Sequence, residues 1–173
     1  MGMELLAAAH LDAFYDADTG TRAARHQLEQ LVLFLPHAAA IDAFQHWVYT
    51  RPDEASDRAA RDAAWLAQHR RLCPGVDWSG LEADRAALWQ RRLHVFELPF
   101  YYIEYAIAGL GAVRLHRRAL AEPAAAVADL RRALALGARA RLPDLFAAAG
   151  LYFGTDRNTV RRAAAACREL LDL

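Results

Sequence analysis

The sequence predicts an all-α protein, and three observations support that fold class. Alanine, leucine and arginine dominate its 173 residues, and these side chains lose little conformational freedom in a helix. Apolar residues recur at helical spacing through nearly every segment, without the strict alternation that marks a half-buried strand. Prolines, glycines and capping residues separate the periodic segments. A chain of this length fits one sizeable core, so we expect a single helical domain over residues 1–173.

Four helices are expected in the first half of the chain. The first covers residues 3–15 and ends at DADTG. The second begins after Gly20, and because its apolar pattern resumes beyond Pro36, one long helix kinked at that proline is consistent with it. Acidic residues in RPDEASD suit the first turn of a third helix, which reaches residue 72. The loop CPGVDWSG then leads into a fourth helix over residues 81–96.

The second half continues in the same way. The sequence ELP breaks the fourth helix, and a long one follows over residues 100–121. Pro123 suits the first position of the next helix, where its missing N–H costs nothing, and Gly137 closes it. LPDLFAAAG is a short helix, and the last helix begins with Thr155 or Asp156 as its N-cap.

The charge balance argues against a nucleic-acid-binding protein. The chain has 21 basic and 21 acidic residues, and every basic one is an arginine. These arginines are scattered, with Asp and Glu close by, whereas a nucleic-acid binder gathers a basic excess on one face. We therefore expect solvated helix faces with local ion pairs and no nucleic-acid partner.

Cysteine usage and hydropathy favour a cytoplasmic protein that has no membrane partner. Cys73 and Cys167 form neither a disulfide framework nor a metal motif, and a free cysteine is usually a small buried residue. The N-terminal segment lacks the basic leader of a signal peptide, and no apolar run approaches the roughly 20 residues that span a bilayer.

The segment HVFELPFYYIEYAIAGLG, residues 94–111, is unusually rich in tyrosine. Tyr101 and Tyr105 lie four residues apart and therefore share one helix face, which continues into a row of small residues: Ala108, Gly109 and Ala112. In one interpretation the small row receives a neighbouring helix and the hydroxyls find partners at its edge. In the other, the row lines a groove and the phenols donate hydrogen bonds to a polar ligand. The spacing alone favours packing.

Histidines are less informative by themselves. His94 precedes Pro99 by one short loop and could turn toward the same groove as the tyrosines. His46, in AFQHWVY, is surrounded in sequence by aromatic and apolar residues, so we expect a structural role for it. The seven histidines include no pair at the i, i+4 spacing that places two imidazoles on one helical face, so no metal ligand is expected.

Three segments carry a resemblance to a known family. IDAFQHWVYT at 41–50, HVFELPFYYIEYAIAGLGAVRLH at 94–116 and LRRALALGARARLPDLFAAAGLYF at 130–153 resemble, in this order, the C-terminal part of bacterial oligoendopeptidase F. That enzyme belongs to the thimet oligopeptidase-like zinc metallopeptidases. The first two segments are quite specific, while the third is rich in alanine and leucine. MGMELL resembles the family's segment just after its third zinc ligand, so the resemblance covers nearly the whole chain.

The resemblance implies an almost entirely helical peptidase part that binds short peptides. Enzymes of this family hold zinc through HExxH and a later glutamate, and the metal polarises the scissile carbonyl and activates water. A downstream histidine and tyrosines contact the substrate and stabilise the tetrahedral intermediate. Matching that element to this sequence implicates His94 and Tyr105 as catalytic residues, and Tyr101 and Tyr102 as substrate-binding residues.

The sequence departs from the family at the metal. No HExxH occurs, and Glu4 matches a later family glutamate that is not a zinc ligand. Zinc is therefore expected in the parent enzyme and not on this chain alone. The resemblance implies a C-terminal portion of a peptidase catalytic domain, inactive by itself.

Two partner expectations follow from that interpretation. Helices that face a missing portion should expose apolar surface, and the N-terminal helix, with Met3, Leu6, Ala7 and Leu11 on one side, is a candidate. We expect self-association or binding to a complementary N-terminal fragment. The alternative is a non-catalytic helical interaction module derived from the same fold.

Overall fold

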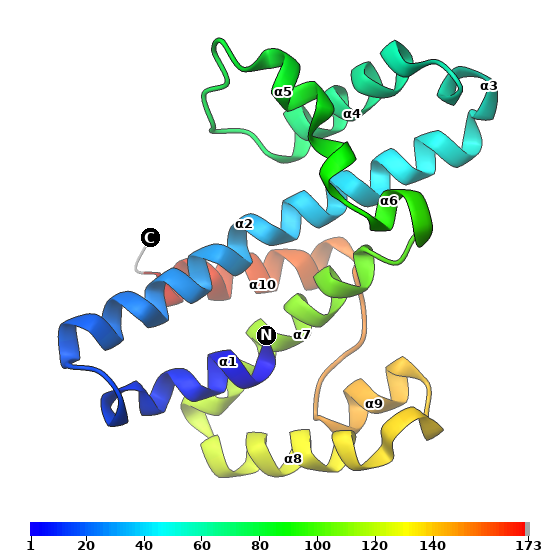
Figure 1. The fold of residues 1–173 in the computed structure, drawn as a ribbon. Helices are drawn as coiled ribbons and strands as arrows, with labels where there is room; N and C mark the ends of the chain where they lie inside the picture. The colour runs from blue at the N-terminus through cyan, green and yellow to red at the C-terminus, as the bar shows by residue number, and fades with distance from the viewer. Residues whose placement is uncertain (172–173) are drawn as a thin grey trace. The chain divides into compact units, whose positions relative to one another are not determined.

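The computed structural model describes residues 1–171, and every regular element in that range is a helix. The all-α prediction is confirmed (Figure 1). The chain divides into two units, one of residues 1–32 and 107–171, the other of residues 33–106. The expected single domain stays a prediction. No helix of the described chain is both long and apolar enough to cross a membrane.

The N-terminal segment is more broken than its sequence predicts. Instead of one helix, α1 (Gly2–Ala7) passes into the 3₁₀ helix η1 (Ala8–Ala13), where His10 leaves the helical region of φ and ψ. The next helix begins before Gly20, because the Asp16 carboxylate accepts a hydrogen bond from the Thr19 N–H at 2.8 Å and caps it.

Helix α2 (Ala17–Thr50) is a single element of 34 residues that contains Pro36. The continuation of the helix through this proline agrees with the apolar pattern on both sides of it. Residues up to Val32 belong to the first unit and the rest of the helix to the second.

Two helices that we expected to be continuous are interrupted. The third splits into α3 (Pro52–Ala55) and α4 (Arg58–Leu72), because Asp57 turns extended and its carboxylate caps α4 through the Ala60 N–H at 2.7 Å. The fourth splits where Arg92 leaves the helical conformation. Its pieces are α5 (Glu82–Ala87), η2 (Leu88–Arg91) and α6 (His94–Glu97).

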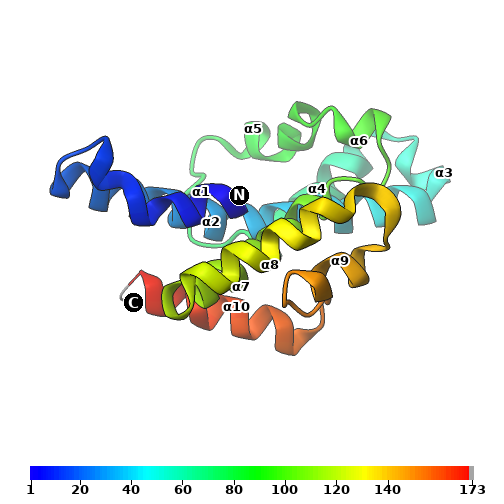
Figure 2. The ribbon, with the colours of Figure 1, turned by 90° about the horizontal axis from the view of Figure 1, so that it is seen from below.

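The remaining helices lie close to their predicted bounds: α7 (Ile103–Ala121), α8 (Pro123–Leu136), η3 (Gly137–Arg139), α9 (Leu142–Ala148) and α10 (Arg157–Leu170). Asp156 is the N-cap of α10 and accepts from the Asn158 and Thr159 N–H groups. Helices α8 and α9 lie side by side (Figures 1 and 2).

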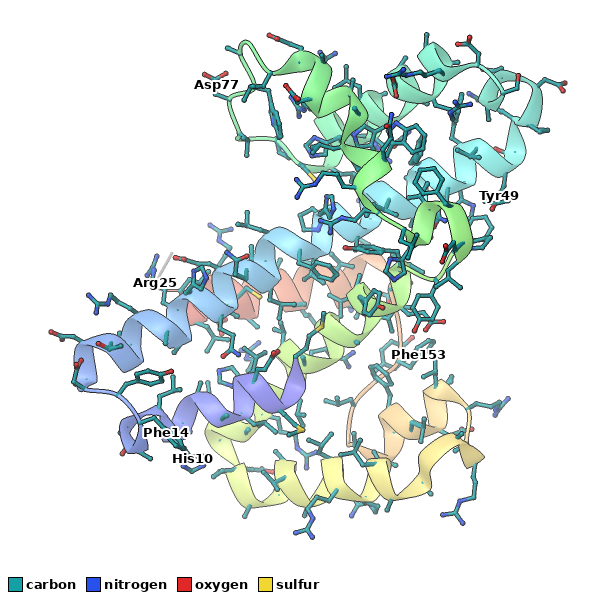
Figure 3. The ribbon with its side chains drawn as sticks, viewed as in Figure 1. His10, Phe14, Arg25, Tyr49, Asp77 and Phe153 are labelled. Atoms are coloured by element: carbon teal, nitrogen blue, oxygen red, sulfur yellow. The ribbon has the colours of Figure 1, made fainter. Side chains whose placement is uncertain are left out.

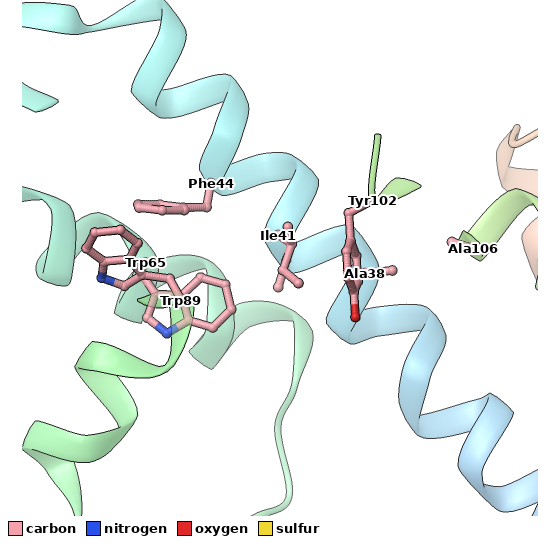
Figure 4. Packing of buried hydrophobic residues seen from close by; sticks show 8 residues of the cluster. Ala38, Ile41, Phe44, Trp65, Trp89, Tyr102 and Ala106 are labelled. Carbon is pink, nitrogen blue, oxygen red and sulfur yellow. The ribbon is translucent and has the colours of Figure 1, made fainter. Parts of the chain in front are cut away.

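Buried aromatic rings form the core of the second unit (Figure 4). Phe44 and Trp65 are fully buried and meet edge-on with their centroids 5.8 Å apart. Both core indoles find acceptors: Trp65 Nε1 donates to the Arg85 carbonyl at 2.9 Å, and Trp89 Nε1 donates to Asp62 at 2.8 Å. Such bonds let large amphipathic rings fill a core without an unpaired N–H.

Close packing at a glycine and the polar contacts of two arginines hold the first unit together. A Cβ on Gly111 would lie 2.9 Å from the Phe146 ring, so glycine permits that close approach. Arg118 pairs with Asp129 at 2.6 Å and also donates to the Ala149 carbonyl. Arg25, labelled in Figure 3, donates to the Leu171 carbonyl at 3.2 Å and ties α2 to the end of α10.

Candidate functional site

The four residues that the sequence nominates lie within one short stretch of the second unit. His94 is the first residue of α6, and Tyr105 lies in the first turn of α7. Tyr101 and Tyr102 occupy the turn that joins these helices. The break at ELP therefore folds the histidine back toward the tyrosines.

Aromatic contacts hold the four side chains together. The His94 ring stacks on Tyr101, with 5.8 Å between centroids and 11° between planes. It meets Tyr102 and Tyr105 edge-on, at 5.1 and 5.6 Å. His94 Nε2 lies 3.3 Å from the Tyr105 hydroxyl oxygen, within hydrogen-bonding distance. We call these four residues the His94 cluster.

Exposure separates the tyrosines. Tyr101 is 39% exposed, Tyr105 is half-buried and Tyr102 is only 6% exposed. The first two rings thus keep a solvent-facing edge, while Tyr102 packs among other rings. The expected contact between Tyr102 and substrate stays a prediction.

The row of small residues behaves as the packing interpretation predicts at two of its three positions. Gly109 and Ala112 are buried, and Ala108 is exposed. An open groove along the whole row is therefore not present in this structure.

Gln45 holds the turn that carries the tyrosines, and sequence reasoning did not identify it. Its side chain is 1% exposed, and both ends of its amide are used. Nε2 donates to the His94 carbonyl at 3.3 Å, and Oε1 accepts from the Phe100 N–H at 3.2 Å. A polar residue four positions after Ile41, on the apolar face of α2, was the signal that could have identified it.

The backbone at Phe100 is strained, which fits a turn fixed from outside. Phe100 has φ +58°, a left-handed conformation that is costly for a bulky residue. Its ring lies 4.7 Å from His46 and 5.2 Å from Tyr49, which is labelled in Figure 3. His46, for which we expected a structural role, is exposed on α2 and lies 3.6 Å from Asp42. Its structural role stays a prediction.

The electrostatics of Tyr105 suit a neutral hydrogen-bond donor. Partial burial, together with the neighbouring phenols of Tyr101 and Tyr102, raises the pKa of Tyr105 above its usual value. A phenol of this kind keeps its proton at neutral pH and can donate it to a developing negative charge.

A second cluster in the same unit brings together residues far apart in sequence. His37 of α2, His69 of α4 and Cys73 each offer a ligand atom, and these atoms lie within 4.8 Å of one another. We call this the His37 cluster. His69 and Cys73 are four residues apart on one helix face, a spacing that a search for histidine pairs alone overlooks. His37 could be found only from the tertiary structure.

Burial favours the neutral form of all three members of the His37 cluster, and arginines add to this effect at the two histidines. Arg92 Nε donates to His37 Nε2 at 3.2 Å, and Arg85 Nε donates to His69 Nδ1 at 3.1 Å. Burial, with Arg92 and His69 nearby, lowers the pKa of His37 to about 4. Burial and Arg85 lower the pKa of His69 as well, while burial raises that of the Cys73 thiol.

Comparison with solved structures identifies two similar chains. PZ peptidase A, in a complex with an inhibitor, matches 99% of this chain with TM-score 0.90 and 27% identity. A protein described as an oligoendopeptidase F matches 90% with TM-score 0.82 and 29% identity. No family model and no curated protein matches the sequence.

The chain spans only 30% and 27% of the lengths of those two structures. Their agreement with it nevertheless extends over almost all of its helices. This chain therefore has the fold of part of an oligoendopeptidase F-like peptidase, as its sequence motifs predict.

Proposed function

We propose that this chain forms part of the substrate-binding wall of a zinc-dependent metalloendopeptidase that hydrolyses short peptides. The observation that carries the proposal is the 3.3 Å contact between His94 Nε2 and the Tyr105 hydroxyl, beside the exposed ring of Tyr101. The similarity to peptidases in fold supports the substrate class.

The contact gives His94 and Tyr105 complementary parts in stabilising a tetrahedral intermediate. When the imidazole hydrogen is on Nε2, it donates to the phenol oxygen and leaves the phenol hydrogen free. The phenol then donates to the oxyanion that forms when the scissile carbonyl is attacked. Tyr101, with its exposed edge, contacts the peptide, and Tyr102 supports the other rings from behind.

This chain lacks the residues that hold zinc in such enzymes, because its sequence contains no HExxH. In this proposal the zinc ligands belong to another portion of the enzyme. The chain alone is expected to bind peptide without hydrolysing it, and no step of the reaction is assigned to the metal.

Binding of a tetrahedral mimic tests the proposal. A short peptide with a phosphinic group in place of its scissile amide should bind the full chain more tightly than the parent peptide. Tyr105→Phe should weaken binding of the phosphinic peptide roughly tenfold, because a hydrogen bond to a charged group is lost. Binding of the parent peptide should change less than about twofold, since the lost bond forms only with the oxyanion.

Tyr15→Phe is the matched control, because Tyr15 is an exposed tyrosine of the first unit. It should leave both affinities unchanged. Equal losses for both peptides in Tyr105→Phe would contradict a role with the intermediate. If neither peptide binds the unaltered chain, the substrate-binding proposal fails.

A non-catalytic interaction module is the second candidate, favoured by apolar surface on the N-terminal segment. Met3 is 75% exposed and Phe14, labelled in Figure 3, is 81% exposed. Exposed large apolar side chains that recur on one segment are typical of a contact surface. A complementary N-terminal fragment or a second copy is the partner we propose, and in this candidate the chain associates without binding either peptide.

A further inference from the structure

We propose that His37, His69 and Cys73 form a binding site for a zinc-class transition-metal ion. The His37 cluster includes none of the four residues of the His94 cluster, and its donor set is independent of HExxH. Two imidazoles and one thiolate are ligands that zinc and cobalt prefer, and they leave a fourth tetrahedral position for solvent.

Distances within the cluster are close to those of a tetrahedral site. Metal–nitrogen bonds of about 2.0 Å and metal–sulfur bonds of about 2.3 Å place tetrahedral ligand atoms roughly 3.3–3.6 Å apart. The three ligand atoms lie within 4.8 Å of one another. Side-chain rotation alone has to close the remaining gap of about 1 Å, because α2 and α4 already bring the residues together.

The cluster is also chemically prepared for an ion. Metals bind neutral imidazole, and each ring has an unprotonated nitrogen, since one nitrogen of each accepts a hydrogen bond from an arginine. Cys73 lies beside both rings and supplies the sulfur ligand. On binding, the sulfur–hydrogen bond breaks, the proton goes to solvent and the thiolate bonds to the ion.

Arg85 and Arg92 oppose metal binding, so substituting either arginine should change the affinity for the metal. Each guanidinium donates to an imidazole nitrogen and occupies the lone pair there. If the ion takes that nitrogen, the guanidinium has to withdraw. If it takes the other nitrogen, the ring hydrogen moves to face the arginine, and two donors then oppose each other. Either way, metal binding releases both guanidinium contacts.

An unpaired N–H on Trp78, whose ring contacts His69, is a second observation that supports the site. Its ring meets His69 edge-on at 5.8 Å, and Arg85 lies over it at 5.5 Å. The buried Nε1 of Trp78 has no acceptor among the described residues. Buried N–H groups are rarely left unpaired, and in this proposal a solvent molecule bound to the ion supplies the missing acceptor.

Cobalt binding tests the site by its colour. Titrating the reduced full chain with Co²⁺ should give one equivalent of bound metal, the visible bands of a tetrahedral complex and a near-ultraviolet sulfur-to-cobalt charge-transfer band. Cys73→Ser should lose the charge-transfer band and weaken binding by more than the roughly tenfold that loss of an outer contact costs. Cys167→Ser, which changes the only other cysteine, should keep the band.

Arg85→Met should tighten cobalt binding about tenfold, because the metal no longer displaces a charged hydrogen bond from His69. Its folding is checked by circular dichroism, so a loss of binding in a folded variant counts against the arginine's role. A charge-transfer band that survives in Cys73→Ser, or that never forms in the unaltered chain, overturns the proposal. In that case the His37 cluster is only a packed set of rings.

Discussion

His37 and His94 both pack edge-on against Tyr102, at 6.3 and 5.1 Å, yet their hydrogen bonds differ. His94 is paired with a neutral phenol, and the Tyr101 ring stacked on it keeps an exposed edge. His37 is paired with the guanidinium of Arg92 and lies among buried aromatic rings. The same kind of side chain thus lies beside an exposed ring in one cluster, while in the other burial, with Arg92 nearby, lowers its pKa and keeps it neutral.

Tyr102 belongs to the His94 cluster and also contacts the His37 cluster. Its buried ring meets His37 edge-on, and Arg92 lies over it at 5.9 Å. Because His37 lies among buried rings, changes to the residues packed around the His37 cluster should lower the free energy of unfolding. Changes on the exposed side of the His94 cluster should instead affect ligand binding.

The largest effect is expected for Trp65→Ala. Trp65 is fully buried and lies 6.2 Å from His37 and 5.3 Å from His69. Removing it should lower the free energy of unfolding by about 3–5 kcal/mol, as for other large-to-small core changes. Tyr101→Ala should lower it by less than about 1 kcal/mol, because that ring is partly exposed. Urea denaturation measures both, and similar losses would erase the contrast between the clusters.

The second-largest effect is expected from acid, which should lower the free energy of unfolding through His37. The pKa of His37 falls from 6.5 to about 4 on folding, so the unfolded chain takes up the proton first as pH decreases. Stability is fully present above pH 6.5 and is lost as pH falls toward 4. After allowance for solvent screening, the loss should be roughly 2–3 kcal/mol, and the lowered pKa of His69 adds to it in the same direction.

His37→Gln should flatten this part of the pH profile, since glutamine can accept from Arg92 without titrating. His46→Gln changes an exposed histidine of the same helix and should leave the acid loss in place. Denaturation midpoints measured from pH 7 down to pH 4 check both variants. An unchanged profile in His37→Gln would show that another group carries the acid sensitivity.

The two clusters also differ in how far the sequence could predict them. Helical periodicity indicated nearly every helix, and the motif around residues 94–105 located the His94 cluster, because its members are close in sequence. The contact between Arg92 and His37 could not be predicted, since the two residues lie 55 positions apart in the sequence. Cys73 and His69 share a readable spacing, but their approach to His37 depends on how α2 packs against α4.

Gln45→Met should have a smaller effect on stability than Trp65→Ala or acid, and a more specific effect on binding. Methionine keeps the length of the side chain but leaves the Phe100 N–H unpaired and weakens the hold on the His94 carbonyl, so we expect a loss of about 1–2 kcal/mol. The released turn no longer has to keep the positive φ of Phe100, and His94 and Tyr105 then lose their fixed distance. The phosphinic peptide should bind severalfold more weakly.

Gln90→Met, at an exposed position, is the control and should leave stability and binding unchanged. If Gln45→Met is destabilised but binds the phosphinic peptide normally, the glutamine serves the fold alone and the His94 cluster is positioned by its own ring contacts.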